Sequence, residues 1–346
     1  MKKIAIIGAG GFTGAEMLQL LGKHPKAEVV LATSSLYANQ SIAQVFPKHD
    51  IKKYQTLKFS DHPKSVAEAP ECDIYFIATP DGVAMHWVPD VIESGKIVID
   101  ISGAFRVNEN SYQEYYNKEH PQKKYLDQAV YGLSEFNREK IRFAQLISNP
   151  GCYATSVLLP LVAVAGLDFI NSETLIIDSK SGTSGAGGRN EKDSLGYSTV
   201  YENFRAYKLE NHQHLPEIYE TGSEILSNKI KGIRFTPQLL PLFRGIFNNT
   251  YFTGVQLSEN ELVQIKNSFK QISIKEKFIR YYENPNDIKL SNVQQTNYCD
   301  ISYYYDGKAQ VLQVVSAIDN IMKGAAGQAL QNFNIRFGFE ETMGLD

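Results

Sequence analysis

Cysteine is scarce in this chain, and so are long apolar runs. Its 346 residues include three cysteines, Cys72, Cys152 and Cys299, which lie far apart and lack the close pairing of metal-binding or redox motifs. We therefore expect free thiols in a reducing cytoplasm. No apolar stretch approaches the roughly 20 residues that a helix needs to span a bilayer, so no membrane partner is expected. The N-terminus, MKKIAIIGAGG, breaks into glycines after four apolar residues, which is typical of a strand rather than a signal peptide.

An excess of charge of either sign is also missing. Lysine and arginine total 35 against 38 for aspartate and glutamate, a net charge of −3. Nucleic acids and anionic membranes select basic surfaces, so neither is an expected partner. The apolar content of 43% and the charged content of 21% are ordinary for a soluble globular protein, and the length fits two domains.

The first half of the chain alternates apolar strands with helices. Four segments that are apolar on both faces are expected to form strands, at residues 3–8, 28–34, 73–80 and 96–102. A glycine-rich turn and a helix that stops near Gly22 follow the first strand, and another helix is expected at 83–93. Buried strands that alternate with helices indicate a parallel sheet covered on both sides. We therefore predict a doubly wound α/β domain over residues 1–148.

After residue 150 the pattern changes to longer strands whose apolar residues often alternate, at 174–180, 248–257 and 299–317. Within the last of these, Asp306-Gly307 is a strong signal for a two-residue hairpin turn. The tail is helical again from Ser316 onward, and Ser316 with Asp319 resembles a capping box. These features predict a second domain of α+β type with a mostly antiparallel sheet.

Three evenly spaced glycines, Gly8, Gly11 and Gly14, separate the first expected strand from the first expected helix. Glycines there let the backbone turn tightly and approach a pyrophosphate, whose charge meets the amides at the helix N-terminus. We interpret this turn as a dinucleotide site. A purely structural turn is the alternative.

The end of the second expected strand indicates which dinucleotide binds. NAD sites place an acidic residue there, which binds the ribose 2′-hydroxyl. This chain has Thr33, Ser34 and Ser35, whose hydroxyls can donate to a 2′-phosphate while no carboxylate repels it. That favours NADP, although the arginine expected in an NADP site is missing and the three residues could simply end a strand.

One cysteine stands directly after Asn149, Pro150 and Gly151, just before an apolar run at residues 156–167. Such a turn would present Cys152 at a helix N-terminus, where the dipole and the unpaired amides favour the thiolate. Beside a nicotinamide, a thiolate can attack an acyl phosphate, expel phosphate and form a thioester that accepts hydride more readily than a carboxylate does. The alternative is a small buried residue that follows a turn.

A thiol nucleophile needs an acid/base partner, and the segment Asn211–Glu217 holds two clustered histidines. His212 or His214, oriented by Glu217, could supply or take the proton. A metal site would need a third protein ligand, so no metal is expected. A polar loop before the helix that Pro216 opens is the remaining alternative. The other histidines stand alone and are interpreted as surface or packing residues: His24, His49, His62, His86 and His120.

Two further loops follow expected strands. The glycine-rich segment at residues 181–189 could close over a nicotinamide or a phosphate, or it could be a flexible surface loop. Arg106 ends the segment Ser102-Gly103-Ala104-Phe105-Arg106, at the carboxyl end of a strand, where α/β sheets bind ligands. A guanidinium there suits bidentate binding of a phosphate or a carboxylate. A solvated loop arginine is the alternative.

Ten motifs spread along the chain resemble one family. They are GAGGFTGAE, ATPDGV, DISGAFR, VYGLSEFNREKI, SNPGCYAT, SGTSGAGGR, HQHLPEI, FTPQLLPLFRGI, NYCDIS and AIDNIMKGAAGQALQNFN. The chain resembles the N-acetyl-γ-glutamyl-phosphate reductases of arginine biosynthesis, within the wider aspartate-semialdehyde dehydrogenase superfamily. The HQHLPEI motif, the FTP…RGI block and the KGAAGQA helix are specific to the reductase branch.

The resemblance implies a Rossmann-like NADP-binding domain and an α+β catalytic and oligomerisation domain. Because the family's C-terminal helix packs back on the first domain, it implies domains at 1–148 plus 317–346 and at 149–316. It also implies NADPH-dependent reduction of N-acetyl-γ-glutamyl phosphate to N-acetylglutamate 5-semialdehyde and phosphate, by a homodimer or homotetramer. The same chemistry on aspartyl phosphate or carrier-linked aminoadipyl phosphate, and a catalytically silent NADP-binding regulator, are the alternatives.

The resemblance also assigns site residues, motif by motif. Cys152 corresponds to the nucleophile, and Arg106 and Asn149 correspond to substrate-binding residues. His212, His214 and Glu217 match the family's catalytic and substrate-orienting cluster, with His212 the preferred acid/base. The residues expected to bind NADP(H) are Gly8, Gly11, Phe12, Thr13, Gly14, Thr33, Ser34, Ser35, Pro80, Ser181, Gly182 and Asn320.

The departures from the family pattern are small, and none affects the nucleophile or the histidine cluster. Ala154 and Ser134 stand where proline is common. Gly10 replaces a frequent serine, and Gln238 stands where histidine is usual. Ser35 replaces the arginine that often follows Thr-Ser.

Overall fold

The structure is a computed structural model that describes residues 1–47, 52–54, 56–170, 174–186, 197–227 and 230–345. It contains two compact units. Unit 1 comprises Met1–Pro150 and Ala325–Asp346, and unit 2 comprises Gly151–Gly324. The segment 317–324, which the sequence analysis assigned to the nucleotide-binding domain, falls in unit 2 because residues 317 and 318 complete the last strand of its sheet.

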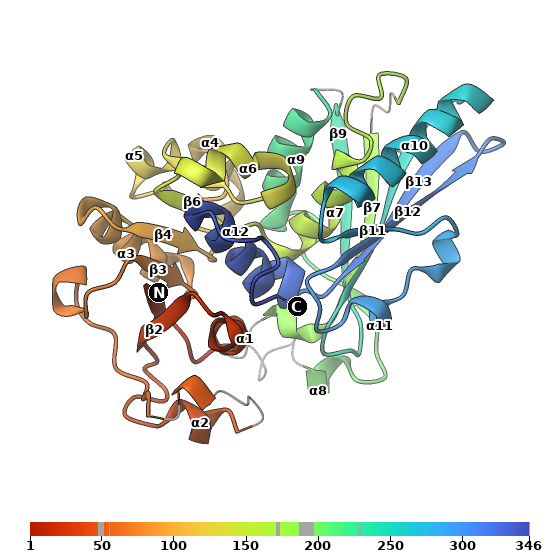
Figure 1. The fold of residues 1–346 in the computed structure, drawn as a ribbon. Coiled ribbons are helices and arrows are strands. Elements are labelled where there is room, and N and C mark those ends of the chain that lie inside the picture. The colour runs from red at the N-terminus through yellow and green to blue at the C-terminus, as the bar shows by residue number, and fades with distance from the viewer. Residues whose placement is uncertain (48–51, 55, 171–173, 187–196, 228–229, 346) are drawn as a thin grey trace. The chain divides into compact units, whose positions relative to one another are not determined.

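A six-stranded sheet lies at the centre of unit 1, with the strand order β2-β1-β3-β4-β6-β5 (Figure 1). Every neighbouring pair in it is parallel. Its strands are β1 (Lys2–Ile7), β2 (Ala27–Ala32), β3 (Ile74–Ile77), β4 (Ile97–Asp100), β5 (Ala129–Tyr131) and β6 (Leu146–Ser148). The helices of unit 1 are α1 (Phe12–Lys23), α2 (Ile42–Val45), α3 (Asp81–Glu93), α4 (Glu109–Tyr116), α5 (Lys123–Leu126), α6 (Ser134–Phe143) and α12 (Gly327–Phe337).

This arrangement confirms the predicted doubly wound fold. All four residues of β3 are buried, as expected for a strand covered on both faces. The chain leaves β1 for β2 on one side and returns to β3 on the other, so the strand order reverses at β1. Open α/β sheets bind ligands at the carboxyl ends of the strands beside such a switch point. Because all six strands are parallel, their carboxyl ends share one edge of the sheet.

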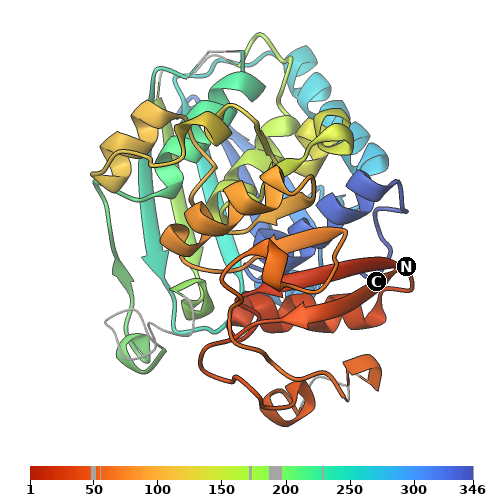
Figure 2. The ribbon, with the colours of Figure 1, turned by 90° about the vertical axis from the view of Figure 1, so that its left-hand side faces the viewer.

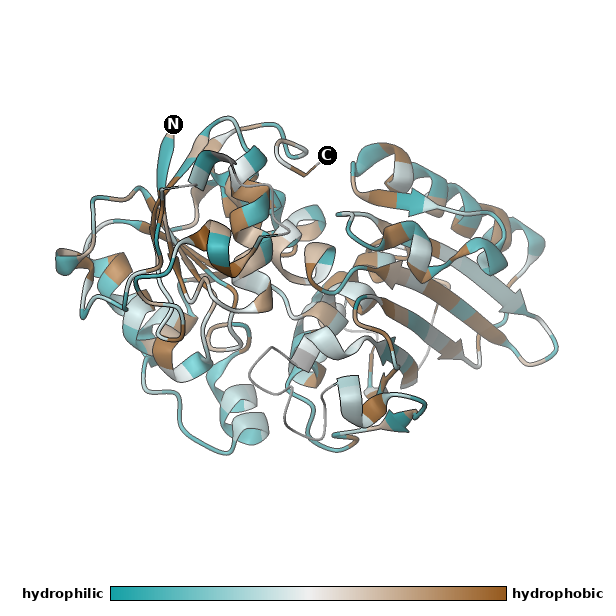
Figure 3. Cartoon of the chain, turned by 90° about the horizontal axis from the view of Figure 1, so that it is seen from below, coloured by the Kyte–Doolittle hydropathy of each residue, from teal (hydrophilic) through white to brown (hydrophobic). Residues whose placement is uncertain are grey.

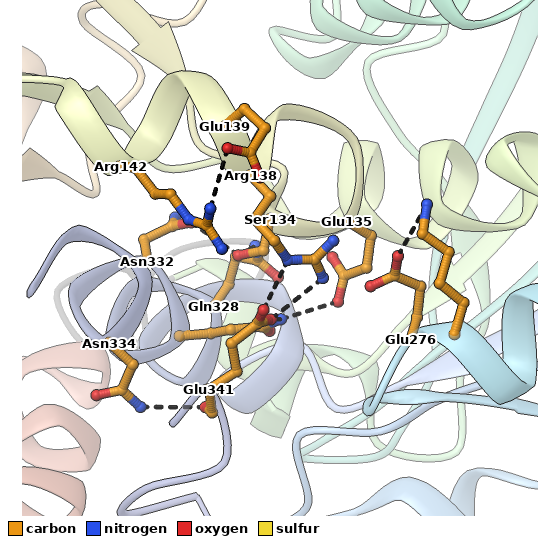
Figure 4. A network of polar contacts seen from close by, with 12 residues as sticks. Ser134, Glu135, Arg138, Glu139, Arg142, Glu276, Gln328, Asn332, Asn334 and Glu341 are labelled. Carbon is orange, nitrogen blue, oxygen red and sulfur yellow. Dashed lines mark hydrogen bonds and ion pairs between the residues drawn. The ribbon is translucent and has the colours of Figure 1, made fainter. Parts of the chain in front are cut away.

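The C-terminal helix α12 joins unit 1 through buried amide side chains (Figure 4). Asn332 accepts a hydrogen bond from the Ser134 hydroxyl at 2.7 Å and donates to the carbonyl of Gly132 at 2.8 Å. Gln328 donates to the same hydroxyl and the same carbonyl. Ser134 stands where the family usually has proline, and here its hydroxyl is one of the groups that hold α12 in place.

Unit 2 contains a seven-stranded sheet with the order β11-β12-β13-β10-β7-β9-β8, whose long strands run side by side (Figure 2). The strands are β7 (Thr174–Ser181), β8 (Arg205–Ala206), β9 (Gly232–Leu239), β10 (Ile246–Thr253), β11 (Ile279–Tyr281), β12 (Cys299–Asp306) and β13 (Val311–Ile318). Four pairs are antiparallel, and β11–β12 and β7–β9 are parallel. The predicted mostly antiparallel sheet is confirmed.

The helices of unit 2 are α7 (Cys152–Val162), α8 (Tyr197–Val200), α9 (His214–Ile225), α10 (Glu259–Lys275) and α11 (Leu290–Val293), and a π-helical turn spans Met322–Ala326. Apolar and polar residues alternate along the strands of the sheet (Figure 3). On β10, Ile246, Asn248, Thr250 and Phe252 are buried and the residues between them are half-exposed. Helix α7 lies against β10, β13 and α9, and its residues from Tyr153 to Leu161 are buried.

Two local predictions in this region are wrong. The loop between β12 and β13 has four residues, because Asp306 accepts hydrogen bonds from the amides of Lys308 and Ala309 and the left-handed position falls on Gln310, with a φ of 54°. Ser316 does not cap a helix. It lies in β13 and donates its hydroxyl to the carbonyl of Ser156 on α7.

Asp319 alone caps the turn that follows β13, because its carboxylate accepts from the amides of Ile321 and Met322. The helical tail therefore begins after Asp319, with the π-helical turn, and continues as α12. Across the described residues, no helix is both long and apolar enough to cross a bilayer.

Candidate active site

Packing alone requires two glycines of the nucleotide turn. Gly8 has a φ of +89°, and a Cβ on it would lie 2.5 Å from the carbonyl oxygen of Ala78, at the end of β3. A Cβ on Gly14 would lie 2.5 Å from the Cα of Ala9. These positions let the turn pass close to β3 and let α1 pack against the turn, the two roles that glycines have in a dinucleotide fingerprint.

Gly11 is different, because a Cβ there would meet nothing within 4 Å among the described atoms. It is the N-cap of α1, in an extended conformation that any residue can adopt, and no side chain caps the helix there. The Thr79 side chain lies against Gly8 of the same turn, and its hydroxyl is buried with no hydrogen-bond partner among the described residues. An open helix N-terminus and an unsatisfied hydroxyl at the same turn fit the pyrophosphate of a dinucleotide.

The three hydroxyl residues after β2 differ in burial and in hydrogen bonding. Thr33 is fully buried and its hydroxyl accepts the amide N–H of Gly8 at 3.0 Å, so it fixes the turn. Ser34 is 6% exposed and accepts the amide of Tyr37. Ser35 is exposed. A side chain on Gly10 would collide with Ser34, whose Cβ lies 2.9 Å from the position of the added Cβ, which explains why serine is absent from position 10.

Arg106 and Asp100 lie at the carboxyl end of β4. The guanidinium of Arg106 donates to the carbonyl of Ile101 at 2.7 Å. Asp100 is fully buried, and its carboxylate accepts the amide and the hydroxyl of Ser102. Burial raises the pKa of Asp100 to about 6, although the Ser102 bonds and the charge of Arg106 lower it. The side chain of Arg106 is half-buried at the edge of the sheet where ligands bind.

Asn149, predicted to bind substrate, is fully buried and committed to unit 1. Its amide group donates to the carbonyl of Ala325 at 3.1 Å and its oxygen accepts from Asn332 at 3.1 Å. Its backbone N–H donates to the carbonyl of Asp100 at 2.7 Å. Asn149 therefore holds the end of β6, three residues before the thiol.

The thiol turn places Cys152 at the first position of α7, as predicted. Gly151 is the N-cap, and its amide donates to the Glu217 carboxylate at 2.9 Å. Glu217 lies in the first turn of α9 and is 1% exposed. A Cβ on Gly324 would lie 2.8 Å from the Cβ of Cys152, so the π-helical turn packs directly on the half-buried cysteine.

The two histidines of the cluster lie in contact, with ring centroids 4.9 Å apart. Burial lowers the pKa of His212 well below its usual value, assisted by the neighbouring His214 and Lys208. The His214 amide donates to Nδ1 of His212 at 3.1 Å, so neutral His212 carries its proton on Nε2. His214 Nε2 lies 3.9 Å from the Glu217 carboxylate. Unit 2 thus brings Cys152, both histidines and Glu217 into one cluster.

Tyr153 and Tyr207 pack against this cluster. The Tyr207 hydroxyl donates to that of Tyr153, which donates to the carbonyl of Gln238 at 2.9 Å. The ring of His212 packs edge-on against both tyrosines. Burial raises the pKa of both hydroxyls, so they stay neutral donors. The Gln238 side chain points to Asp178 on β7 and donates to its carboxylate. Tyr153 contacts the backbone carbonyl of Gln238, a group that the family's histidine would also provide.

The glycine-rich loop is described as far as Ala186, and residues 187–189 lie outside the described residues. A Cβ on Gly182 would lie 2.6 Å from the carbonyl of Phe243, and the Gly182 amide donates to the carbonyl of Gly245. Asn320 accepts the Gly245 amide at 2.7 Å and donates to the Ser184 hydroxyl at 2.8 Å. The loop is therefore fastened to residues 242–245. Ser181 is 2% exposed and donates to the carbonyl of Gly182.

Across the described parts of the chain, no group of three or more histidine, cysteine, aspartate or glutamate side chains could hold a metal ion.

Comparison with known proteins gives the chain a family. Two family models match it, one described as semialdehyde dehydrogenase, NAD binding domain, over residues 3–144, and one as semialdehyde dehydrogenase, dimerisation domain, over 152–320. An N-acetyl-gamma-glutamyl-phosphate reductase of Leptospira interrogans is 41% identical over 346 residues, which cover 100% of this chain and 99% of the relative. The chain belongs to the N-acetyl-γ-glutamyl-phosphate reductase family.

Other reductases of the family agree. Those of Geobacter metallireducens and Methanopyrus kandleri are each 41% identical, covering 100% of this chain and 98% of each relative. Residues 3–144 therefore form the nicotinamide-binding domain of an oxidoreductase. The fold is shared more widely. Aspartate semialdehyde dehydrogenase II from Vibrio cholerae superposes with a TM-score of 0.71 at 17% identity, over 98% of both chains.

Sequence reasoning missed several groups around the family's site. Tyr207 lies in none of the ten motifs, and Thr79 lies in ATPDGV but was assigned no role. Their places depend on contacts with residues distant in the chain, Tyr153 and Gly8. His62 was interpreted as a surface or packing residue, yet its ring bonds to Thr33 beside the nucleotide turn. Its proximity to Thr33 depends on the pairing of a loop with β2.

Proposed function

We propose that this chain reduces N-acetyl-γ-glutamyl phosphate with NADPH, giving N-acetylglutamate 5-semialdehyde and phosphate, in the cytoplasmic synthesis of arginine. The observation that carries the proposal is the position of Cys152 at the first residue of α7, directly after Gly151, whose amide bonds to Glu217, the carboxylate beside His214 and, through it, His212. The substrate follows from the name that the full-length relatives share.

Cys152 is the proposed nucleophile. Its thiolate attacks the acyl carbon, the bond from that carbon to the phosphate oxygen breaks, and a thioester forms on the sulfur while phosphate leaves. When bound, the nicotinamide supplies the hydride that reduces this thioester. The resulting thiohemiacetal then collapses, the carbon–sulfur bond breaks, and the aldehyde leaves Cys152 as a thiolate again.

The two histidines are proposed to have different roles in proton transfer. The sequence analysis preferred His212 as acid/base, but its Nδ1 is engaged and burial keeps it neutral, so it is suited to donate from Nε2 to a developing oxyanion. We propose that His214, beside the Glu217 carboxylate, holds and returns the proton. Glu217 also fixes Gly151, so it positions the thiol and the base together.

NADP(H) is the proposed cofactor, bound at the open end of α1. Gly11, Phe12, Thr13 and Gly14 would offer the turn and the helix N-terminus to its pyrophosphate, with Gly8 and Pro80 beside it. The hydroxyls after β2 favour NADP because no carboxylate follows that strand directly. Ser181 and Gly182, at the start of the glycine-rich loop, and Asn320, which bonds to that loop, are proposed for the nicotinamide end.

The acyl-phosphate substrate is proposed to bind through Arg106, whose guanidinium can grip a carboxylate or a phosphate with two hydrogen bonds. Its bond to the Ile101 carbonyl restrains the side chain, and buried Asp100 adds a nearby negative charge. Asn149 has both ends of its amide engaged within unit 1. Any contribution of Asn149 to binding is therefore proposed to come from the shape of its loop.

The domain roles follow from these assignments. We propose unit 1, Met1–Pro150 with Ala325–Asp346, as the NADP domain and unit 2, Gly151–Gly324, as the catalytic and oligomerisation domain. A row across β7, β10, β13 and β12, formed by Ile176, Tyr251, Gln313 and Tyr304, supports a homodimer or homotetramer. Ile176 and Tyr304 in this row are 39% and 54% exposed. The dimerisation-domain model that matches residues 152–320 agrees with this assignment.

A substrate comparison tests the proposal. Purified protein is mixed with NADPH and either N-acetyl-γ-glutamyl phosphate or aspartyl phosphate, and NADPH oxidation and phosphate release are followed together. We expect the acetylated substrate to be favoured in kcat/KM by at least ~100-fold, because a site that pairs polar groups strongly rejects analogues that lack them. Faster turnover of aspartyl phosphate, or no phosphate release at all, would contradict the proposal.

A further inference from the structure

A loop beyond β2 continues the edge of the unit 1 sheet. Ser60 donates its amide to the carbonyl of Ala32 at 3.0 Å and accepts the amide of Ser34 at 2.9 Å. Thr33 and Ser60 form a parallel bridge. Residues far from β2 in sequence are therefore placed beside its carboxyl end, where a dinucleotide fold recognises the ribose that carries the 2′ group.

This pairing brings His62 against Thr33. Nδ1 of His62 lies 2.8 Å from the Thr33 hydroxyl, and the same hydroxyl accepts the Gly8 amide at 3.0 Å. Thr33 is fully buried and His62 is half-buried. A continuous chain of bonds therefore runs from the nucleotide turn through Thr33 to an imidazole ring. Since Nδ1 faces Thr33, Nε2 is the nitrogen on the far side of the ring.

The hydroxyl of Ser60 gives a second, independent observation. It is buried and has no hydrogen-bond partner among the described residues. Ser60 pairs with Thr33, and His62, two residues further on, bonds to the Thr33 hydroxyl, so both residues lie beside Thr33. An unsatisfied buried hydroxyl beside an imidazole marks a place where a ligand oxygen can be bound.

Ser35, which is exposed and carries only a hydroxyl, stands where an arginine usually binds the 2′-phosphate. We propose that His62 takes this role, binds the 2′-phosphate of NADP(H) through its ring, and sets the preference for NADP(H) over NAD(H). An imidazole N–H donates to a phosphate oxygen as a charge-assisted bond. This inference rests on the proposed function, because it assigns a residue to the cofactor named there.

Asp61 is the nearest group that could favour NAD(H) instead, because a carboxylate repels a 2′-phosphate and accepts from a 2′-hydroxyl. It is exposed and lies between Ser60 and His62 in the chain. Lys64, also exposed, adds a positive charge two residues beyond His62. The bond to Thr33 singles out His62 from this segment.

Calorimetric titration of the whole protein tests the assignment, with NADPH, NADH, 2′,5′-ADP and 5′-AMP as probes. The two adenosine phosphates report on the 2′ group without catalysis. We expect His62→Ala to weaken NADPH and 2′,5′-ADP by ~10-fold or more, the range for a lost bond to a charged group, and NADH and 5′-AMP by less than ~2-fold. His62→Arg should restore the preference, and Asp61→Asn should leave it within ~2-fold.

The outcomes separate the two proposals. A wild-type protein that does not prefer NADPH contradicts the NADP assignment itself. A wild-type preference that survives His62→Ala overturns only the role of His62, as does an equal loss of all four probes. A larger change with Asp61→Asn than with His62→Ala would assign the discrimination to Asp61. If His62→Ala is unfolded at the assay temperature, the His62→Arg titration decides. If His62→Arg does not prefer NADPH over NADH, the assignment of His62 to the 2′-phosphate is contradicted.

Discussion

The nucleotide turn and the thiol turn follow the same local pattern but have different surroundings. Each joins a strand to a helix through a glycine N-cap in an extended conformation, and in neither does the capping residue supply a side-chain bond. At Gly11 the space beyond the backbone is open among the described atoms. At Gly151 the amide is taken by Glu217, and the neighbouring cysteine packs against Gly324.

The difference fits the role proposed for each turn. The turn at Gly11 leaves its helix N-terminus accessible, which suits a ligand that arrives and leaves. The turn at Gly151 is held by a buried carboxylate from another helix, which suits a nucleophile that must stay in one position. The same local pattern, a glycine N-cap between a strand and a helix, therefore occurs at two turns with different proposed roles. The residues packed around each turn make the difference.

Replacing the nucleophile should produce the largest effect. Cys152→Ser should keep the fold and lower kcat by at least ~10³-fold, because a hydroxyl is a far weaker nucleophile than a thiolate. Cys72→Ala is the matched control, since this thiol is buried in unit 1, donates to the carbonyl of Pro70, and burial raises its pKa. Steady-state assays of both variants check this, and appreciable activity of Cys152→Ser would place the nucleophile elsewhere.

Replacing Glu217, whose carboxylate holds the thiol turn, should produce the next largest effect. Glu217→Ala leaves the buried Gly151 amide without its acceptor, at a cost of about 2–3 kcal/mol in the free energy of unfolding. Glu217→Gln keeps an oxygen acceptor and should lose about 1 kcal/mol or less. Urea unfolding of the two variants gives the comparison. Equal losses for alanine and glutamine would mean that the bond does not hold the turn.

Asp100 lies next to the residues that lead into the thiol turn, because its backbone carbonyl accepts the amide of Asn149. Its buried side chain makes the stability of unit 1 depend on pH. Its pKa is raised from 3.8 to about 6 by burial, so its favourable contribution to stability is complete below pH 3.8 and is lost as the pH rises through about 6. Relative to wild type, Asp100→Asn should therefore gain about 3 kcal/mol between pH 3.8 and pH 7. A stability difference that stays constant over this range contradicts the assignment.

The open turn should give the smallest effect on stability and a specific effect on binding. Gly11→Ala should change the free energy of unfolding by less than about 1 kcal/mol, yet weaken NADPH by ~10-fold, because the added methyl enters the ligand's space. Gly14→Ala should behave in the opposite sense and destabilise the fold by about 1–3 kcal/mol, because its methyl collides with Ala9. Thermal unfolding and calorimetric titration of both variants decide whether the two glycines differ.

Much of the fold could be predicted from sequence because burial on both faces leaves apolar runs that are readable locally. The segment that forms β3 is an example. The hairpin after Asp306 was mispredicted because its carboxylate bonds to two later amides and lengthens the loop. The helical tail was started too early because Ser316 bonds to Ser156, a contact across 160 residues.

The site divides in the same way. The glycine spacing and the cysteine after Asn-Pro-Gly are local signals, and in the structure each lies at the start of a helix, as the sequence predicted. The bonds from Gly151 to Glu217 and from Thr33 to His62 join residues 66 and 29 positions apart. A single sequence carries no signal for such pairs, so both bonds appeared only in the folded chain. The resemblance to a family assigned Glu217 to the cluster but not to Gly151.

The central claim is that Cys152 carries the acyl group. Mixing the protein with N-acetyl-γ-glutamyl phosphate in the absence of NADPH tests it most directly, with phosphate release followed in the first turnover and the protein then analysed by mass spectrometry. The account predicts a burst of about one phosphate per site and an N-acetylglutamyl adduct on the peptide that contains Cys152. Wild-type protein that releases phosphate only when NADPH is present, with no adduct on that peptide, would contradict it.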